Sequence, residues 1–311
     1  MIFDRYSTEG LFISYFSALA TEPVILIAKK TMKKILVTGA NGYIGRHVVK
    51  ELLNRGNNVI ACDIHTENVD NRAIKMNFNL FDLPGGNLFE ILGSPDVCLH
   101  MAWRNGFVHN ADTQMTDLSA HYTFLTRLIN DGLKQLAVMG TMHEVGYWEG
   151  AIDENTPCNP MSMYGIAKDA LRRSMTLYCK NNSCILQWLR CYYILGDDRK
   201  NNSIFCKLLN AAEEGKKTFP FTSGKNKYDF IEVDTLASLL SSAVLQNEVN
   251  GVINCCTGKP MSLGERVEQF IKDNHLNISL DYCAFPDRPY DSPCVYGNPD
   301  KINQILERNH V

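Results

Sequence analysis

This sequence has little excess charge of either sign. Its 311 residues include 31 Lys and Arg against 34 Asp and Glu, which gives a formal net charge of −3 at pH 7. The basic residues are scattered along the chain, so no basic surface predicts binding to nucleic acid. Apolar residues make up 45% of the chain, an ordinary share for a globular protein.

Paired cysteines are also missing. The 11 cysteines are odd in number, none belongs to a C-x-x-C pair, and most lie within apolar runs, as Cys98 and Cys191 do. This usage is typical of reduced, buried thiols and predicts a cytoplasmic protein without a disulfide framework. His143 and Glu144 have no third ligand at metal-binding spacing, so the sequence predicts no metal site.

No apolar run is long enough to span a membrane. Residues 12–20 are apolar, but two acidic residues precede them and Pro23 interrupts the stretch soon afterwards. These flanks fit neither a signal peptide nor a transmembrane helix, so we expect no membrane association. The sequence from Met32 onward resembles an ordinary N-terminus, and we expect residues 1–31 to be an extension outside the catalytic fold.

Short apolar strands alternate with amphipathic helices along most of the chain. This alternation predicts a doubly wound α/β fold of the Rossmann type, with a parallel sheet and right-handed crossovers. The predicted strands are 35–37, 58–62, 76–81, 97–101, 135–139 and 184–189, and the predicted helices are 43–54, 112–130 and 163–180.

Two regions differ in composition from this alternating part. Residues 196–227 are polar and rich in Asn and Lys, with one helix-like stretch at 204–214, and the chain after Gly258 is rich in proline. We therefore expect a Rossmann domain at 32–195 with a return segment at about 228–250. The segments 196–227 and 251–311 are expected to form a smaller substrate-binding part.

A glycine-rich turn follows the first strand and opens the first helix. It contains Gly39, Asn41, Gly42, Tyr43, Ile44 and Gly45. The first glycine permits a tight turn, the second lets the backbone approach a pyrophosphate, and the third lets the helix pack close to the strand. Because the helix N-terminus offers free N–H groups to phosphates, the turn predicts a dinucleotide site.

An acidic residue favours NAD as the dinucleotide. Asp63 ends the next strand, 18 residues after Gly45, where a carboxylate accepts hydrogen bonds from the adenosine ribose and repels a 2′-phosphate. His65 and Arg72 stand close enough in sequence to accommodate such a phosphate, so NADP stays open.

Three polar residues have the pattern of a hydride-transfer site. Tyr164 and Lys168 stand at i and i+4, on one face of a predicted helix. The ammonium is expected to lower the pKa of the phenol, so that Tyr164 exchanges a proton near neutral pH. Thr141 closes a predicted parallel strand at its carboxyl end, where ligands bind in such sheets, and is expected to hold the substrate oxygen.

These features together resemble the extended short-chain dehydrogenase/reductase family, the NAD-dependent epimerase/dehydratase group that acts mainly on nucleotide sugars. The resemblance runs from Lys33 to about Asn303. It implies catalytic roles for Thr141, Tyr164 and Lys168 and cofactor contacts from Tyr164 and Lys168. It also implies cofactor contacts from Met101, Ala102 and Trp103 and from the adenine-contacting pair Asp82 and Leu83, and a substrate contact from Arg288.

The chain departs from this family on the substrate side. Met142 and His143 stand where dehydratases carry an Asp-Glu pair, which argues against dehydration because Met142 cannot transfer a proton. Tyr193 and Tyr228 replace the usual Asn and Arg that touch the diphosphate. We count these four among the candidate substrate residues. Lys225, Lys227 or Arg199 are candidates to replace the missing anchors, and His121 stands where the family often has a helix Asn.

The leading hypothesis is hydride transfer with NAD(P) at C4 of a nucleotide-linked sugar, such as a 6-deoxysugar, as a 4-ketoreductase or a 4-epimerase. Two alternatives stay open: a reductase of a small carbonyl compound without a nucleotide, and a dinucleotide-binding regulator without catalysis. The family resemblance also implies a homodimer joined through the helices 112–130 and 163–180.

Overall fold

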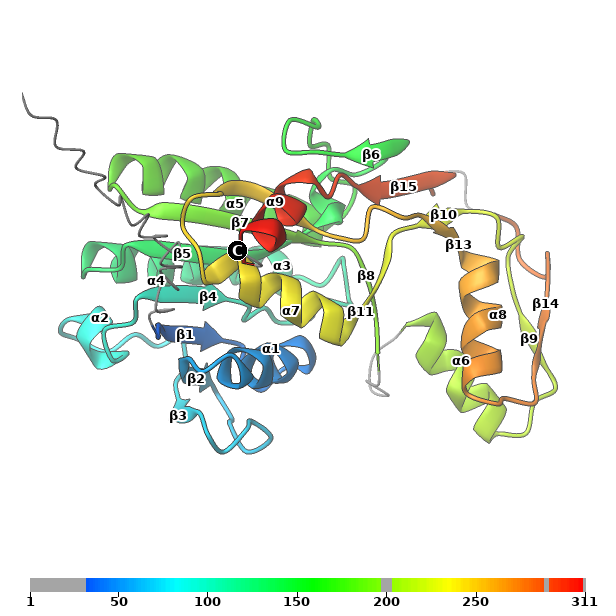
Figure 1. Ribbon diagram of the computed structural model, residues 1–311. Coiled ribbons are helices and arrows are strands. Elements are labelled where there is room, and N and C mark those ends of the chain that lie inside the picture. Colours follow the sequence, from blue (N-terminus) through cyan, green and yellow to red (C-terminus); the bar gives the residue numbers. More distant parts are fainter. Residues whose placement is uncertain (1–31, 197–202, 288–290, 310–311) are drawn as a thin grey trace, which may run out of the picture. The chain divides into compact units, whose positions relative to one another are not determined.

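A parallel sheet of seven strands forms the centre of the computed structural model, which describes residues 32–196, 203–287 and 291–309 (Figure 1). The strands run in the order β12-β7-β5-β4-β1-β2-β3, and every neighbouring pair is parallel. They are β1 (Lys34–Thr38), β2 (Asn58–Asp63), β3 (Ile74–Asn77), β4 (Val97–His100), β5 (Gln135–Thr141), β7 (Ile185–Cys191) and β12 (Gly251–Cys255).

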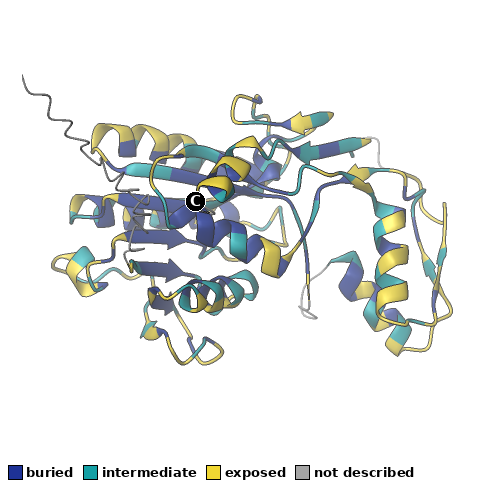
Figure 2. Cartoon of the chain, viewed as in Figure 1, coloured by how far each residue is buried: buried dark blue, intermediate teal, exposed yellow. Residues whose placement is uncertain are grey.

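Helices cover both faces of this sheet and bury a separate apolar cluster on each (Figure 2). One face packs against α1 (Tyr43–Asn54), α7 (Val233–Val244) and α9 (Asp300–Asn309). The other face packs against α2 (Leu88–Ile91), α4 (Leu118–Asn130) and α5 (Met163–Asn181). Because both faces are covered, the central strands are continuous apolar runs, as Ile35, Leu36 and Val37 illustrate. The predicted doubly wound α/β fold is confirmed.

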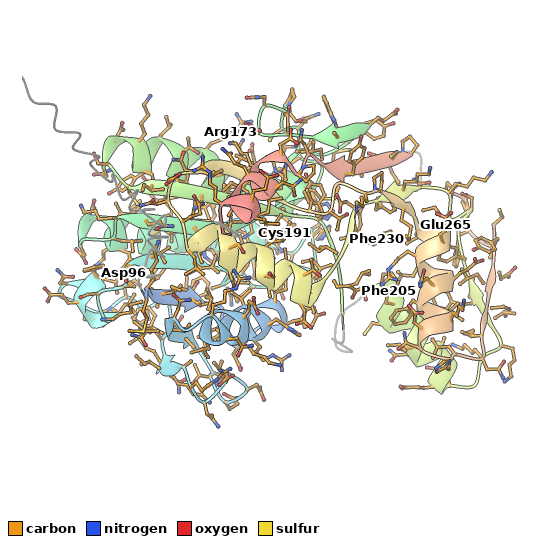
Figure 3. The ribbon with its side chains drawn as sticks, in the orientation of Figure 1. Asp96, Arg173, Cys191, Phe205, Phe230 and Glu265 are labelled. Atoms are coloured by element: carbon orange, nitrogen blue, oxygen red, sulfur yellow. The ribbon has the colours of Figure 1, made fainter. Side chains whose placement is uncertain are left out.

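The remaining elements build a smaller part around the chain segments that follow β7. They include β8 (Tyr193–Leu195), α6 (Ile204–Glu213), β9 (Thr218–Pro220), β11 (Phe230–Glu232), α8 (Leu263–Asp273) and β14 (Ser279–Asp281). A second sheet of four strands joins β6 (Gly150–Ile152), β10 (Lys227–Tyr228), β13 (Met261–Ser262) and β15 (Cys294–Gly297). Figure 3 labels Phe205 of α6 and Phe230 of β11, whose rings pack edge to face with centroids 6.4 Å apart.

Three predicted boundaries differ from the structure. The strand expected at 76–81 ends at Asn77, and the helix expected at 112–130 is divided at Asp117 into α3 (Thr113–Thr116) and α4. The expected division after residue 250 also fails, because β12 pairs with β7 in the main sheet and α9 packs on α7. The central fold therefore includes 251–255 and 300–309. The predicted extension, 1–31, lies outside the described residues.

No helix in the described ranges combines the length and the apolar character needed to cross a bilayer.

Candidate active site

The glycine-rich turn between β1 and α1 forms a cradle that side chains would fill. Gly39 has a φ of 71°, and a Cβ atom there would lie 2.6 Å from the backbone nitrogen of Ala102. A Cβ atom at Gly45 would lie 2.1 Å from the carbonyl oxygen of Gly39. Gly42 is the N-cap of α1 and supplies no capping side chain. The helix therefore presents its N-terminal N–H groups and the positive end of its dipole at an open turn.

Other residues of the turn hold its shape. Asp63 ends β2, and its Oδ2 accepts a hydrogen bond of 3.0 Å from the backbone N–H of Asn41. The side chains of Tyr43 and Ile44 turn away from the cradle: the Tyr43 hydroxyl lies against Gly196, and Ile44 packs on the apolar cluster beside α1. Neither of these two side chains lines the cavity in front of the turn.

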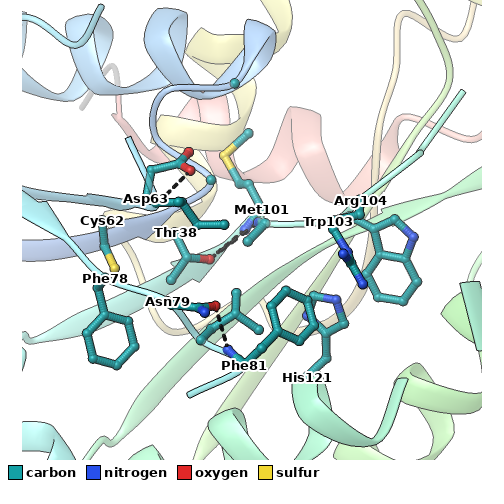
Figure 4. A pocket seen from close by; sticks show the side chains of 15 residues that line it. Thr38, Cys62, Asp63, Phe78, Asn79, Phe81, Met101, Trp103, Arg104 and His121 are labelled. Atoms are coloured by element: carbon teal, nitrogen blue, oxygen red, sulfur yellow. Dashed lines mark hydrogen bonds between the residues drawn. The ribbon is translucent and has the colours of Figure 1, made fainter. Parts of the chain in front are cut away.

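A cavity of about 200 Å³ opens in front of the turn (Figure 4). Gly39, Gly42 and Asp63 line it, as do three further residues predicted to contact the cofactor: Met101, Ala102 and Trp103. In Figure 4, Phe78 lies at one end of this cavity, and Trp103 and His121 lie at the other. The structure thus gathers residues from the ends of β1, β2 and β4 around one cavity, as expected at the carboxyl ends of parallel strands.

The pair predicted to contact adenine does not line this cavity. Asp82 is exposed, and Leu83 packs on the apolar cluster beside α4. Because β3 ends early, at Asn77, the residues of this segment that line the cavity are Phe78, Asn79, Leu80 and Phe81. The predicted pair therefore directly follows the lining segment, and its contact with adenine stays a prediction.

Thr141 and Tyr164 come together through two short structural elements. Thr141 ends β5 and caps the 3-10 turn η1 (Met142–Glu144), while Tyr164 lies in the first turn of α5. Gly165 lets α5 approach this turn closely, since a Cβ atom there would lie 2.3 Å from the carbonyl oxygen of His143. Burial raises the pKa of Tyr164 well above its usual range, and a hydrogen bond with the Thr141 side chain opposes this effect.

A buried carboxylate fixes the position of Thr141. Glu144 is fully buried, and its Oε1 accepts hydrogen bonds of 2.7 Å from the Thr141 N–H and 2.9 Å from the Trp188 indole. The guanidinium of Arg190, itself only 1% exposed, lies 3.4 Å from Oε2 of Glu144. Burial raises the pKa of Glu144, and the charge of Arg190 opposes that rise. Glu144 is thus a structural acceptor that holds the end of β5.

The buried ammonium of Lys168 contacts a backbone carbonyl and an indole ring. Its Nζ donates a 2.9 Å hydrogen bond to the Met139 carbonyl and lies 3.9 Å from the centre of the Trp103 ring. Burial lowers the pKa of Lys168 to about 8. The expected lowering of the Tyr164 pKa by this ammonium is absent here, because desolvation of the phenol dominates. Trp103 in turn stacks on His121 with ring centroids 4.4 Å apart.

His109 is a neighbour of Tyr164 that the sequence did not reveal. Its ring stacks on the Tyr164 ring with centroids 5.2 Å apart and planes 16° apart, and its carbonyl accepts a 2.8 Å hydrogen bond from the Tyr164 N–H. The ring of His143 lies 4.4 Å from the His109 ring, centroid to centroid. No local motif marks His109, which lies in a connection between β4 and α3.

Aromatic side chains occupy the region where the resemblance implies diphosphate anchors. The rings of Tyr193 and Tyr228 pack with centroids 4.4 Å apart, and Phe230 lies beside both. Met142 belongs with Tyr228 to one buried apolar cluster, and both are more than 90% buried. Arg199 and Arg288, the predicted cationic contacts, lie outside the described residues.

Comparison with known proteins identifies the family. The family model "NAD dependent epimerase/dehydratase family" matches residues 35–256. The chain belongs to this family. A dTDP-6-deoxy-L-talose 4-dehydrogenase (NAD(+)) from Aggregatibacter actinomycetemcomitans is 44% identical over 267 residues, which cover 85% of this chain and 98% of that relative.

Solved structures of this family share its fold at lower identity. The UDP-N-acetylglucosamine 4-epimerase of Methanobrevibacter ruminantium M1 is 21% identical, with a TM-score of 0.76 over 88% of this chain and 92% of that chain. The UDP-glucuronic acid 4-epimerase of Bacillus cereus, solved with UDP-glucuronic acid and NAD, is also 21% identical, with a TM-score of 0.73 over 88% and 93% of the two chains.

The residues of this family member fit its cofactor NAD. The cradle around Gly39 and Gly45 is open only because both positions lack a Cβ atom. Asp63 lies beside the cavity as an acceptor for ribose hydroxyl groups. At the other end, the Nε2 atom of His121 is buried and has no hydrogen-bond partner among the described residues. Gly39, Asp63 and Trp103 are among the residues that would hold NAD in this cavity.

Proposed function

We propose that this chain is an NAD-dependent oxidoreductase that interconverts a hydroxyl group and a ketone at C4 of a dTDP-linked 6-deoxyhexose. The observation that carries the proposal is the similarity to dTDP-6-deoxy-L-talose 4-dehydrogenase over nearly the whole of that relative. The hydrogen-bonded pair of Thr141 and Tyr164 at the carboxyl end of the sheet supplies groups of the kind that this chemistry needs.

The proposed roles follow from the positions of the side chains. Bound NAD supplies or accepts the hydride. The Thr141 hydroxyl orients the C4 oxygen, and Tyr164 donates a proton to that oxygen when the ketone is reduced or removes it when the alcohol is oxidised. Because burial keeps Tyr164 protonated near neutral pH, the phenol starts as the proton donor that reduction requires. Lys168 is proposed to hold the nicotinamide ribose when the cofactor is bound.

Asp63 supports NAD over NADP. Its carboxylate lies at the cavity edge and is anchored by the backbone N–H groups of Asn41 and Ile64, at 3.0 and 2.7 Å. A fixed negative charge in that position repels the 2′-phosphate of NADP.

A 4-epimerase is the second candidate. Several curated relatives at 24–27% identity and the two solved structures above are epimerases of nucleotide sugars. Epimerisation and net oxidation use the same proton-transfer residues, but only net oxidation changes the amount of NADH. Elimination of water is a poorer fit, because Met142 and His143 replace an acid-base pair and Met142 is buried in an apolar cluster.

The smaller part of the chain is proposed to cover the substrate, with the nucleotide lying near Tyr193 and Tyr228. These aromatic rings favour stacking over charge pairing. Because they replace the usual diphosphate anchors, they also motivate the alternative of a small carbonyl substrate without a nucleotide. A thermal-shift panel of UDP-, GDP-, CDP- and dTDP-sugars, each with and without NAD+, separates the two. Stabilisation by none of the nucleotide sugars, together with turnover of small ketones, would favour the small substrate.

The proposed mechanism depends on Tyr164. Tyr164→Phe removes the hydroxyl but keeps the ring between its neighbours, so turnover should be lost while NAD+ affinity stays close to that of the wild type. Turnover at the wild-type rate in Tyr164→Phe refutes the proposed role.

We also infer that the protein is a cytoplasmic homodimer. Large apolar side chains are exposed on the helices that the family resemblance implicates: Tyr122 on α4, and Met163, Ile166 and Leu177 on α5. Their burial against a second copy would remove apolar surface from water. All 11 cysteines are free thiols, which suits a reducing compartment. Light scattering during size exclusion tests the dimer, and Ile166→Glu should shift it towards monomer.

A further inference from the structure

We propose that the imidazoles of His109 and His143 form a recognition site for sugar hydroxyl groups beside Tyr164. The inference rests on the proposed function and deepens it, since it assigns residues to the sugar rather than to the nucleotide or the cofactor. His109 is the new member of this site, and we refer to the two residues as the histidine pair.

The connection that carries His109 is held in place from both sides. The buried amide of Gln114 donates hydrogen bonds of 2.8 and 3.1 Å to the carbonyls of Asn105 and Val108. On the other side, the first turn of α5 donates backbone hydrogen bonds to this connection: Tyr164 N–H to the His109 carbonyl and Met163 N–H to the Asn110 side chain. His109 is therefore fixed against the reactive tyrosine before any substrate arrives.

His143 reaches the same place from the other side of the site. It lies two residues after Thr141, and its backbone N–H donates a 3.3 Å hydrogen bond to the Thr141 hydroxyl oxygen. Its ring lies 4.4 Å from the His109 ring and 6.0 Å from the Tyr164 ring, centroid to centroid. The histidine pair and Tyr164 thus form one group of three mutually contacting rings, next to the hydroxyl that orients the C4 oxygen.

The ring nitrogens of the histidine pair have no hydrogen-bond partner within the described part of the chain, although both side chains are only partly exposed. Burial lowers the pKa of His109 and lowers the pKa of His143 to about 4. Both rings are therefore neutral near pH 7, and each offers one donor and one acceptor. Polar groups left unpaired at a preformed site gain most from a ligand that supplies both kinds of partner.

Sugar hydroxyl groups are ligands of this kind, since each both donates and accepts. A hexose whose C4 oxygen lies at Tyr164 and Thr141 carries its next substituents on the neighbouring ring carbons. The His109 ring lies 5.2 Å from the Tyr164 ring, centroid to centroid, and is therefore within reach of those substituents. Recognition by neutral imidazoles also avoids placing another cation beside the phenol.

The test must separate hydrogen bonding from the packing of His109 on Tyr164. His109→Phe keeps a flat ring for stacking but removes both nitrogens, whereas His109→Asn keeps a donor and an acceptor without the ring. The readouts are KM and kcat for dTDP-6-deoxy-L-talose with NAD+, and the affinities for dTDP and for NAD+ alone. His275→Asn, at an exposed histidine remote in sequence from the site, is the control.

We expect His109→Phe to raise KM for the sugar nucleotide about tenfold, the effect of losing one hydrogen bond of ordinary strength. His109→Asn should recover part of this loss, and the affinities for dTDP and NAD+ should not change. Wild-type KM in His109→Phe, or an equal loss of dTDP affinity, overturns the inference. If the wild-type protein does not turn over any dTDP-sugar, the proposed function fails and the inference falls with it.

Discussion

Replacement of Lys168 by methionine should abolish activity and stabilise the fold at neutral pH. Lys168 is 2% exposed, and its ammonium contacts one carbonyl and one indole face. The charges of Glu144 and Cys191 raise its pKa. Burial is the larger effect and lowers the pKa to about 8 from an ordinary value of 10.5. An ammonium that loses protons so readily is destabilised by its surroundings.

The magnitude follows from proton linkage. A pKa of about 8 in the folded state and 10.5 in the unfolded state corresponds to a cost of about 3 kcal/mol while the group is charged in both states. Above pH 8 the folded protein binds fewer protons than the unfolded chain, so the stability contributed by Lys168 rises with pH. Between pH 7 and pH 9.5 this rise amounts to about 2 kcal/mol.

Lys168→Met removes this pH dependence because methionine does not titrate. The variant also loses the hydrogen bond to Met139 and the contact with Trp103, but these packing losses are the same at both pH values. The free energy of unfolding from urea titrations, measured at pH 7 and pH 9.5, should show the advantage of the variant over wild type shrinking by about 2 kcal/mol. Lys180→Met, at an exposed position near the end of the same helix, is the control. If the difference in stability between Lys168→Met and wild type does not change with pH, the buried ammonium is not the source of the pH dependence.

Three further predictions concern the cradle and its support. Gly39→Ala should abolish NAD+ binding, whereas Gly56→Ala should only lower the free energy of unfolding by about 1 kcal/mol. Both glycines have positive φ, but of the two only Gly39 would place a Cβ atom against backbone. Equal NAD+ affinities of the two variants, measured by calorimetry, would contradict this prediction. Asp63→Asn should lower the preference for NAD+ over NADP+ in kcat/KM, and an unchanged ratio would remove Asp63 from cofactor selection. Glu144→Gln should lower the free energy of unfolding by about 3 kcal/mol, because the buried guanidinium of Arg190 then has no carboxylate beside it. A loss below about 1 kcal/mol would mean that Glu144 does not compensate the charge of Arg190.

Much of the cofactor side was predictable from local pattern. Gly39, Gly42 and Asp63 lie where a strand, a turn and a helix impose them, and short-range geometry decides their positions. Tyr164 was placed correctly on helix α5 because the i to i+4 spacing is a property of the helix itself. The lowered pKa of Lys168 was not predictable in the same way, since it depends on which distant segments of the chain bury the ammonium.

The predictions that failed depend on contacts between segments that are distant in the sequence. The strand expected to reach residue 81 ends at Asn77, because β3 is an edge strand that pairs with β2, and Asp82 lies just beyond the lining segment 78–81. Residues 251–255 were assigned to the smaller part because five residues carry too little periodicity to reveal that they pair with β7. His109 was missed because its place beside Tyr164 is produced by contacts across more than 50 residues of chain.

The proposed activity is net hydride transfer at C4 of a dTDP-6-deoxyhexose. The most direct measurement incubates the full chain with NAD+ and dTDP-6-deoxy-L-talose and follows absorbance of NADH together with the mass of the sugar nucleotide. We expect one NADH for each sugar nucleotide that loses two hydrogens, and no reaction in Tyr164→Phe. Conversion of the sugar to its C4 epimer without accumulation of NADH, or no reaction with the wild-type protein, would contradict the claim.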